Sequence, residues 1–176
     1  MTPALPASEG FSYREHRLHC EEVALDALAQ RYGTPLYVYS RSAIEGAYAA
    51  YASALKGRSA LVCYAVKANS NLAVLDVLAR RGAGFDIVSG GELARVLAAG
   101  GDASRVVFSG VGKTEVEIEA AMKAGVACFN VESSPELDRI DAAARRQQKR
   151  ARVALRVNPD IDARTHPYIS TGLKNK

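Results

Sequence analysis

The feature that most constrains the fold is a strand–helix repeat between residues 61 and 158. Short apolar segments alternate with amphipathic segments, and the apolar segments begin at nearly even spacing. Such alternation predicts an α/β protein with a parallel sheet, because each crossover between parallel strands needs a helix. We predict strands over residues 61–66, 84–89, 105–110, 127–133 and 152–158, and helices over residues 71–82, 91–101, 114–125 and 134–148.

Two architectures fit this repeat: a doubly wound open sheet, and part of a (β/α)8 barrel. Five strands would complete a flavodoxin-like sheet but would be only a fraction of a barrel. The predicted strands are apolar throughout, which is typical of strands covered on both faces. The repeat therefore predicts the α/β class and leaves the architecture open.

The segments that flank the repeat are less regular. We interpret residues 1–15 as a loose lead-in and predict strands over 16–23 and 36–40 and helices over 24–32 and 42–56. The chain ends in an 18-residue polar stretch without a closing helix. A complete domain rarely ends in this way, so we expect the 176 residues to be a piece of a longer protein.

Composition excludes several classes of protein. Hydrophobic residues make up 48% of the chain and charged residues 24%, as in soluble globular proteins, and no apolar run approaches the ~20 residues of a membrane span. A net charge of +4 with both signs interspersed argues against a dedicated nucleic-acid binder. Cys20, Cys63 and Cys128 have no metal-binding or disulfide spacing, so we expect a reducing, cytoplasmic setting and no metal.

Lys67 is the most informative polar residue, because it follows six apolar strand residues. In either architecture, functional side chains gather at the carboxyl ends of the strands. Burial there would favour a neutral amine, which can attack a carbonyl group and form a Schiff base. A strand-end lysine that reaches into solvent is the commoner case. Position alone therefore leaves both readings open.

The next predicted strand and the helix after it each carry one acidic residue of interest. Asp86 lies within that strand and needs a cationic or hydrogen-bonding partner, for which Lys67 and Arg156 are candidates at other strand ends. Capping of the next turn is the alternative role for Asp86. Glu92 falls in the first turn of the following helix, where the helix dipole favours a carboxylate.

The segment GVGKT (residues 110–114) resembles a phosphate-binding loop only superficially. The phosphate loop requires the spacing G-x-x-x-x-G-K-[ST], and its first glycine would fall at Val107. Thr114 followed three residues later by Glu117 instead predicts a helix capping box.

Five segments in order resemble the diaminopimelate decarboxylases: PLYVYS, YAVKAN, GFDIVSGGEL, VVFSGVGKT and RVNPDIDARTHPYISTGLK. These fold-type III enzymes depend on pyridoxal 5'-phosphate (PLP) and are related to ornithine and arginine decarboxylases and alanine racemase. The resemblance runs from about residue 21 to the end. YAVKAN is moderately specific, because related decarboxylases carry close variants, whereas NPDIDARTHPYISTG is highly specific.

The resemblance implies a role for each matching residue. Lys67 matches the catalytic lysine that holds PLP as a Schiff base. Asp86 and Glu92 match acidic residues near the cofactor, and Arg156 matches an arginine near its phenolic oxygen. A loop that we place around the active site contributes two further residues, His166 and Tyr168.

The resemblance also implies an architecture. Residues 42–176 would form the first five strands of a PLP-binding (β/α)8 TIM-type barrel, and residues 1–41 would begin a second, β-rich domain completed by later parts of the chain. The family's phosphate cup and catalytic cysteine would lie beyond Lys176. We therefore expect these 176 residues to be inactive alone.

The implied function is decarboxylation of meso-2,6-diaminopimelate to L-lysine and carbon dioxide, the last step of lysine biosynthesis. It implies a cytoplasmic homodimer with a small-molecule substrate and neither nucleic-acid nor membrane partners. Two alternatives remain: another fold-type III enzyme, such as an ornithine or arginine decarboxylase or an amino-acid racemase, and a non-catalytic PLP-binding protein on the same barrel. The segment THPYISTG favours the diaminopimelate decarboxylases.

Overall fold

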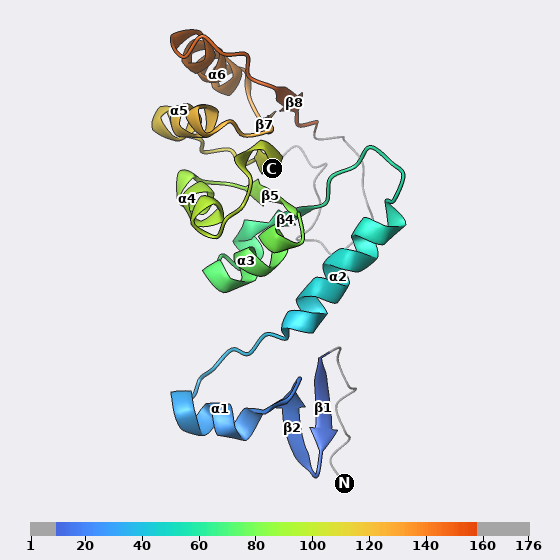
Figure 1. Ribbon diagram of the computed structural model, residues 1–176. Helices are drawn as coiled ribbons and strands as arrows, with labels where there is room; N and C mark the ends of the chain where they lie inside the picture. The colour runs from blue at the N-terminus through green and yellow to red at the C-terminus, as the bar shows by residue number, and fades with distance from the viewer. Residues whose placement is uncertain (1–9, 158–176) are drawn as a thin grey trace, which may run out of the picture.

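A five-stranded parallel sheet forms the centre of the chain. The computed structural model describes residues 10–157. The strands lie side by side in sequence order: β4 (Cys63–Ala65), β5 (Gly84–Ile87), β6 (Val106–Phe108), β7 (Cys128–Val131) and β8 (Val153–Leu155) (Figure 1). A doubly wound sheet would reverse its strand order at a switch point. The uninterrupted order is instead that of a barrel wall, and the predicted α/β class is confirmed.

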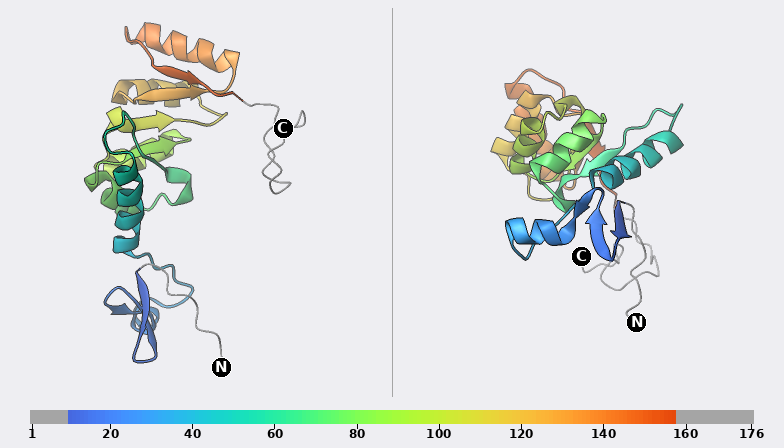
Figure 2. Two further views of the ribbon diagram at one scale, coloured as in Figure 1. Left: turned by 90° about the vertical axis from the view of Figure 1, so that its right-hand side faces the viewer. Right: turned by 60° about the horizontal axis from the view of Figure 1, so that its bottom comes forward.

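The four predicted helices of the repeat are also present. They are α3 (Leu72–Arg80), α4 (Gly90–Ala98), α5 (Glu115–Ala124) and α6 (Ser134–Arg146). All four cover the same face of the sheet (Figures 1 and 2). Short 3-10 turns lie at Val66–Ala68 (η1) and Ala103–Arg105 (η2), so the strands are shorter than predicted.

The two faces of the sheet differ in burial. The face beneath the helices holds the core, where Phe85, Phe108 and Phe129 are at most 2% exposed and the last two rings stack with centroids 6.0 Å apart. Alternate residues on the other face, such as Asp86 and Asn130, are half-buried. Within residues 10–157 the helices therefore cover one face of the sheet and leave the other open (Figures 1 and 2).

A small antiparallel sheet precedes the repeat. It contains β1 (Phe11–Arg14), β2 (Arg17–Cys20) and β3 (Val23–Ala24), and is followed by α1 (Leu25–Tyr32). This unit lies apart from the parallel sheet, and α2 (Arg41–Ala54) leads from one to the other (Figure 1). Residues 11–14 are therefore not part of a loose lead-in, because they pair with β2. The predicted strand at 16–23 is divided into β2 and β3.

The predicted strand at residues 36–40 does not form. These residues have no regular secondary structure, and the side chains of Leu36, Tyr37 and Tyr39 are exposed. A strand needs a neighbouring backbone for its hydrogen bonds. No strand among the described residues pairs with this segment, so its β-branched and aromatic composition alone does not make it a strand.

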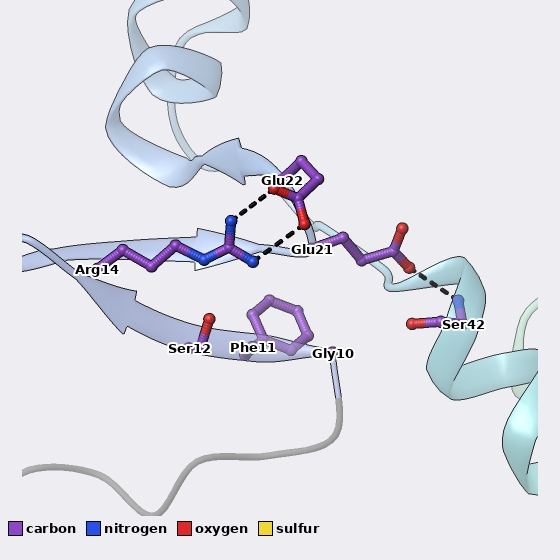
Figure 3. Close-up of a pocket in the computed structure, with 7 residues that line it drawn as sticks. All are labelled: Gly10, Phe11, Ser12, Arg14, Glu21, Glu22 and Ser42. Atoms are coloured by element: carbon purple, nitrogen blue, oxygen red, sulfur yellow. Dashed lines mark hydrogen bonds and ion pairs between the residues drawn. The ribbon is translucent and has the colours of Figure 1, made fainter.

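Hydrogen bonds join the small sheet to the start of α2. Glu21 Oε1 accepts from Ser40 Oγ and from the backbone N–H of Ser42, both at 2.8 Å. The Ser42 N–H and the two serine hydroxyls hold the pKa of Glu21 below its usual value. An open pocket lies beside this contact, where Arg14 pairs with Glu22 (Figure 3). Glu21 therefore caps α2 from the neighbouring sheet.

Candidate active site at the carboxyl ends of the strands

Polar side chains gather at the carboxyl-terminal edge of the parallel sheet. Because all five strands run in the same direction, their last residues meet along this edge. The side chains there come from the ends of β4, β5, β6, β7 and β8 and are, in that order, Lys67, Asp86, Ser109, Asn130 with Glu132, and Arg156.

Lys67 lies in η1, directly beyond β4. It is exposed, and within residues 10–157 its ammonium forms no hydrogen bond or ion pair. Of the two interpretations that its position left open, the lysine that reaches into solvent is the one seen in residues 10–157. β4 is an edge strand of the sheet, and in the turn that follows it only Val66 is buried. The side chain of Lys67 is thus accessible at the carboxyl-terminal edge of the sheet within residues 10–157.

The turn after Lys67 is fixed by its neighbours. The hydroxyl of Tyr64 donates to the carbonyl of Asn69 at 3.2 Å, and burial raises the pKa of Tyr64, which keeps this donor protonated. Asn69 Oδ1 accepts from the N–H of Asn71, whose own side chain caps α3 by accepting from Ala73 N at 2.8 Å. The YAVKAN segment therefore holds the backbone around Lys67 in one conformation.

Asp86 has a different partner from those predicted. Its Oδ1 accepts from the hydroxyl of Ser109 at 2.5 Å, and Ser109 Oγ in turn accepts from Asn130 Nδ2 at 2.9 Å. No hydrogen bond or ion pair joins Asp86 to Lys67 or Arg156 in the described part of the chain. Ser109 follows β6, which lies directly beside β5, whereas Arg156 follows β8, three strands away. Lys67 follows β4, which also lies beside β5, but its side chain is exposed within residues 10–157.

Arg156 pairs with Glu132 at the far end of the sheet. Arg156 Nη1 lies 3.1 and 3.0 Å from the two carboxylate oxygens of Glu132. The side chain of Glu132 is only 10% exposed, whereas that of Arg156 is 61% exposed. Glu132 Oε1 also accepts from the N–H of Gly110 at 2.9 Å. Glu132 therefore links the ends of three strands and holds a guanidinium that remains open to a ligand.

Glu92 lies in the first turn of α4, as predicted. Its Oε2 accepts from the N–H of Val88 at 2.7 Å, and its own N–H donates to the hydroxyl of the N-cap residue Ser89 at 3.2 Å. These bonds close the turn between β5 and α4, which is the structural role expected of a first-turn carboxylate. The other two predicted site residues, His166 and Tyr168, lie outside the described residues.

Lys113, the second lysine near this edge, forms hydrogen bonds inside the fold with its whole ammonium group. Its side chain is fully buried, and its ammonium donates to Gly110 O at 2.7 Å, Asn130 O at 2.8 Å and Glu136 Oε1 at 2.7 Å. An ammonium has three protons, and all three are used. Lys113 therefore braces the ends of β6 and β7 and cannot act as a nucleophile. This buried ion pair was not predicted from the sequence.

The capping box predicted in the GVGKT segment is confirmed. Thr114 Oγ1 accepts from the N–H of Glu117 at 3.3 Å, and Glu117 Oε2 accepts from the N–H of Thr114 at 2.9 Å. Glu117 also contacts the preceding strand–helix unit, because its Oε1 accepts from Gly90 N at 2.8 Å. The segment thus begins α5 and supports the start of α4.

Residues 10–157 contain neither a cluster of metal-binding side chains nor a membrane-spanning helix. No group of three or more histidine, cysteine, aspartate or glutamate side chains is placed to hold a metal ion there. No helix in this part of the chain has the length and hydrophobicity needed to cross a membrane.

Comparison with known proteins matches the chain to one family. Residues 41–176 match the pyridoxal-binding domain of the pyridoxal-dependent decarboxylases. Among curated proteins, the diaminopimelate decarboxylase of Pseudomonas aeruginosa is 65% identical over 164 residues, which is 93% of this chain and 40% of that protein. The chain thus spans about two fifths of the length of that relative.

Solved structures give the same picture. Diaminopimelate decarboxylase from M. jannaschii in complex with L-lysine matches with a TM-score of 0.86 and 39% identity, over 94% of this chain and 40% of that one. Lysine/ornithine decarboxylase from Vibrio vulnificus in complex with cadaverine matches less well, with a TM-score of 0.67 and 25% identity over 76% of this chain and 35% of that one.

Proposed function

Because the chain belongs to the family of pyridoxal-dependent decarboxylases through their pyridoxal-binding domain, we propose that Lys67 holds PLP covalently through its Nζ. The observation that carries this proposal is the contrast between the two lysines near the strand ends. Lys67 is exposed and without a partner among residues 10–157, whereas Lys113 uses all three of its protons inside the fold. Only the former suits Schiff-base chemistry.

The other polar residues at this edge suit a charged cofactor. We propose that Asp86, Glu92 and Arg156 lie around PLP, as the family resemblance implies. Asp86 presents a carboxylate that is anchored through one oxygen, and Arg156 presents an open guanidinium held by Glu132. Glu92 accepts a hydrogen bond from Val88 N through one carboxylate oxygen, and its other oxygen accepts none from the described residues. His166 and Tyr168 are proposed on the resemblance alone.

The reaction we propose for the whole protein is decarboxylation of meso-2,6-diaminopimelate to L-lysine and carbon dioxide. PLP, when bound, supplies the electron sink for the carbanion that loss of carbon dioxide leaves. The residues of this chain contribute the amine that holds the cofactor and the charges that orient it. Support comes from the relatives, since the M. jannaschii structure is a diaminopimelate decarboxylase in complex with L-lysine.

An ornithine- or arginine-type decarboxylase is the alternative within the family. The identity of 25% to the lysine/ornithine decarboxylase, against 65% to a diaminopimelate decarboxylase, favours the latter. The remaining alternatives, an amino-acid racemase and a non-catalytic PLP-binding protein, are separated from it by an activity assay.

We also propose an organisation for the whole protein. Residues 1–41 would begin a β-rich second domain, which agrees in character with the antiparallel strands β1 to β3. Residues 42–176 would form the first part of the barrel. A cytoplasmic homodimer is proposed on the resemblance.

The full-length protein that contains this chain tests the proposal. Purified protein with PLP should release carbon dioxide from meso-2,6-diaminopimelate, and much more slowly from L-ornithine or L-arginine. Borohydride reduction followed by peptide mapping should place the pyridoxyl group within residues 61–69. A label on Lys113 would contradict the assignment, and turnover of ornithine in preference to diaminopimelate would favour the alternative.

A further inference from the structure

We infer that Ser109 is a positioning residue for the proposed active site: its hydroxyl, directed by Asn130, holds the Asp86 carboxylate in place beside the strand that carries Lys67. This inference rests on the proposed function and deepens it. Neither Ser109 nor Asn130 belongs to the set of residues that the family resemblance assigns to the cofactor.

The three side chains form one row across the sheet. Asp86 lies in β5, Ser109 directly follows β6, and Asn130 lies in β7, so each comes from the next strand along. The row lies on the face away from the helices, where the side chains are half-buried. Its two links measure 2.5 Å from Ser109 Oγ to Asp86 Oδ1 and 2.9 Å from Asn130 Nδ2 to Ser109 Oγ.

The chemistry of the groups fixes the direction of these hydrogen bonds. An ionised carboxylate can only accept, and the amide Nδ2 can only donate. The single hydroxyl proton of Ser109 therefore points to Asp86, and its oxygen receives the proton of Asn130. The bond from Asn130 thus leaves the hydroxyl proton of Ser109 directed to Asp86, and a change of the Ser109 side-chain rotamer would lose both hydrogen bonds.

The backbone does not need this row of side chains. Ser109 N already donates to Ile87 O at 2.7 Å, and regular parallel pairing joins β5 to β6 and β6 to β7. The side-chain row is thus an addition to a complete ladder. Fully hydrogen-bonded polar networks of this kind make the side chains within them rigid, so the row holds Asp86 in one position.

The row leaves one oxygen of Asp86 available. Oδ1 is taken by Ser109, whereas Oδ2 accepts no hydrogen bond from the described residues. In the parallel register Ala65 lies opposite Asp86, and Lys67 follows Ala65 by two residues. A carboxylate that is fixed through one oxygen keeps the other for a cation at the neighbouring strand end. With PLP bound, the nitrogen of Lys67 would be that cation.

The test compares two serines at opposite ends of β6 in the full-length protein. Ser109→Ala removes the hydroxyl that holds Asp86. The matched control is Ser104→Ala, because Ser104 Oγ also donates to an aspartate, Asp102 Oδ1, at 2.7 Å, but before β6 begins. Ser109→Thr keeps the hydroxyl and serves as the rescue variant.

The main readout is the pH at which the absorbance of bound PLP changes. A fixed carboxylate beside a cationic nitrogen favours its protonated form, so Ser109→Ala should lower that pH by about 1 unit. The turnover number should fall about tenfold through misplacement of charge. Ser109→Thr should restore both values, and Ser104→Ala should leave both unchanged. An unchanged or higher midpoint in Ser109→Ala would overturn the inference.

A second variant tests the role of Asn130 in the row. Asn130→Leu has nearly the same volume but removes the amide donor without adding a charge, so the proton of the Ser109 hydroxyl is no longer directed to Asp86. The midpoint should fall in this variant, by less than in Ser109→Ala, and thermal unfolding checks that the protein is folded. A wild-type midpoint in a folded Asn130→Leu protein would contradict the directing role of Asn130.

The test separates this inference from the proposed function. If the wild-type protein carries PLP on Lys67 and the Ser109 variants behave like the control, the proposed function stands and the positioning role fails. If borohydride mapping of the wild-type protein shows no label within residues 61–69, the proposed function itself fails.

Discussion

The two faces of the parallel sheet carry different information. The face beneath α3 to α6 is apolar and closed, with Phe85, Ile87 and Phe108 fully buried against the helices. The opposite face carries Asp86, Ser109 and Asn130, which are half-buried and joined by hydrogen bonds. Neighbouring residues of one strand therefore have different roles, since Phe85 packs in the core whereas Asp86 forms a hydrogen bond with Ser109 on the opposite face.

The two faces therefore separate residues that stabilise the fold from residues that we propose act on the cofactor. Removing a buried aromatic ring leaves a cavity that the fold must tolerate, so changes on the covered face should act on stability. The polar row adds to a backbone ladder that is already complete. Changes on the open face should therefore act mainly on the cofactor.

The largest effect is expected at Lys67. In the full-length protein, Lys67→Ala removes the amine that we propose holds PLP, so turnover of diaminopimelate should be abolished. Because the Lys67 side chain forms no hydrogen bond or ion pair within residues 10–157, the free energy of unfolding should remain close to that of the wild type. Turnover is checked by carbon dioxide release and folding by urea denaturation. Substantial remaining activity would contradict the proposal that the reactive amine lies on the open face.

The opposite result is expected on the covered face. Phe85 is fully buried, and Phe85→Ala should lower the free energy of unfolding by about 3–5 kcal/mol. The turnover number per folded molecule should change little, because the ring packs away from the polar row. Denaturant unfolding and active-site titration with borohydride measure the two quantities. A variant of wild-type stability would show that the helices do not cover this face in solution.

The covered face is also what made the fold predictable. Apolar segments at regular intervals, each followed by an amphipathic helix, identified all five parallel strands and all four following helices. Their ends were less accurate, because a strand ends where its neighbour stops pairing rather than where its apolar residues stop. Residues 36–40 show the same limit, since an apolar β-branched segment without a pairing partner among the described residues forms no strand.

The open face was only partly predictable. Position at a strand end identified Lys67, Asp86 and Arg156, and the resemblance then suggested their roles. It could not identify their partners, because which polar side chains meet depends on register between strands. Ser109 could have been found from alternation within VVFSG, which places it on the same face as Val107 and, through the register, Asp86. The Lys113–Glu136 pair joins residues 23 positions apart, and no local pattern indicates it.

A smaller effect is expected at Asp86 than at Lys67. Asp86→Asn keeps the shape of the side chain and a hydrogen bond with Ser109 but removes the charge. If Asp86 faces the cofactor, the turnover number should fall about 100-fold, whereas the free energy of unfolding should change by less than about 1 kcal/mol. Equal losses of rate and stability would instead support a structural role in the turn. Kinetics and urea denaturation on the same preparations decide between the two.

The smallest effect is expected at Glu117, which lies behind the site. The N–H of Gly90, followed by the N–H and hydroxyl of Thr114, holds the pKa of Glu117 below its usual value of 4.5. A carboxyl whose pKa is lower in the folded state stabilises the fold above its unfolded pKa, and this contribution is lost as the pH falls toward the folded pKa.

Glu117→Gln should remove that acid-sensitive contribution. At pH 7 the variant should be less stable than the wild type by up to about 1 kcal/mol, the usual scale of a helix cap. The difference should shrink as the pH falls from 4.5 toward the lower folded-state pKa, because the unfolded wild-type protein takes up a proton at Glu117 before the folded protein does. Urea denaturation at pH 7, 5 and 3.5 measures it. Since Glu117 holds the starts of α4 and α5 rather than the polar row, the absorbance midpoint of bound PLP should not move. A shifted midpoint would show that the helix starts and the open face are coupled.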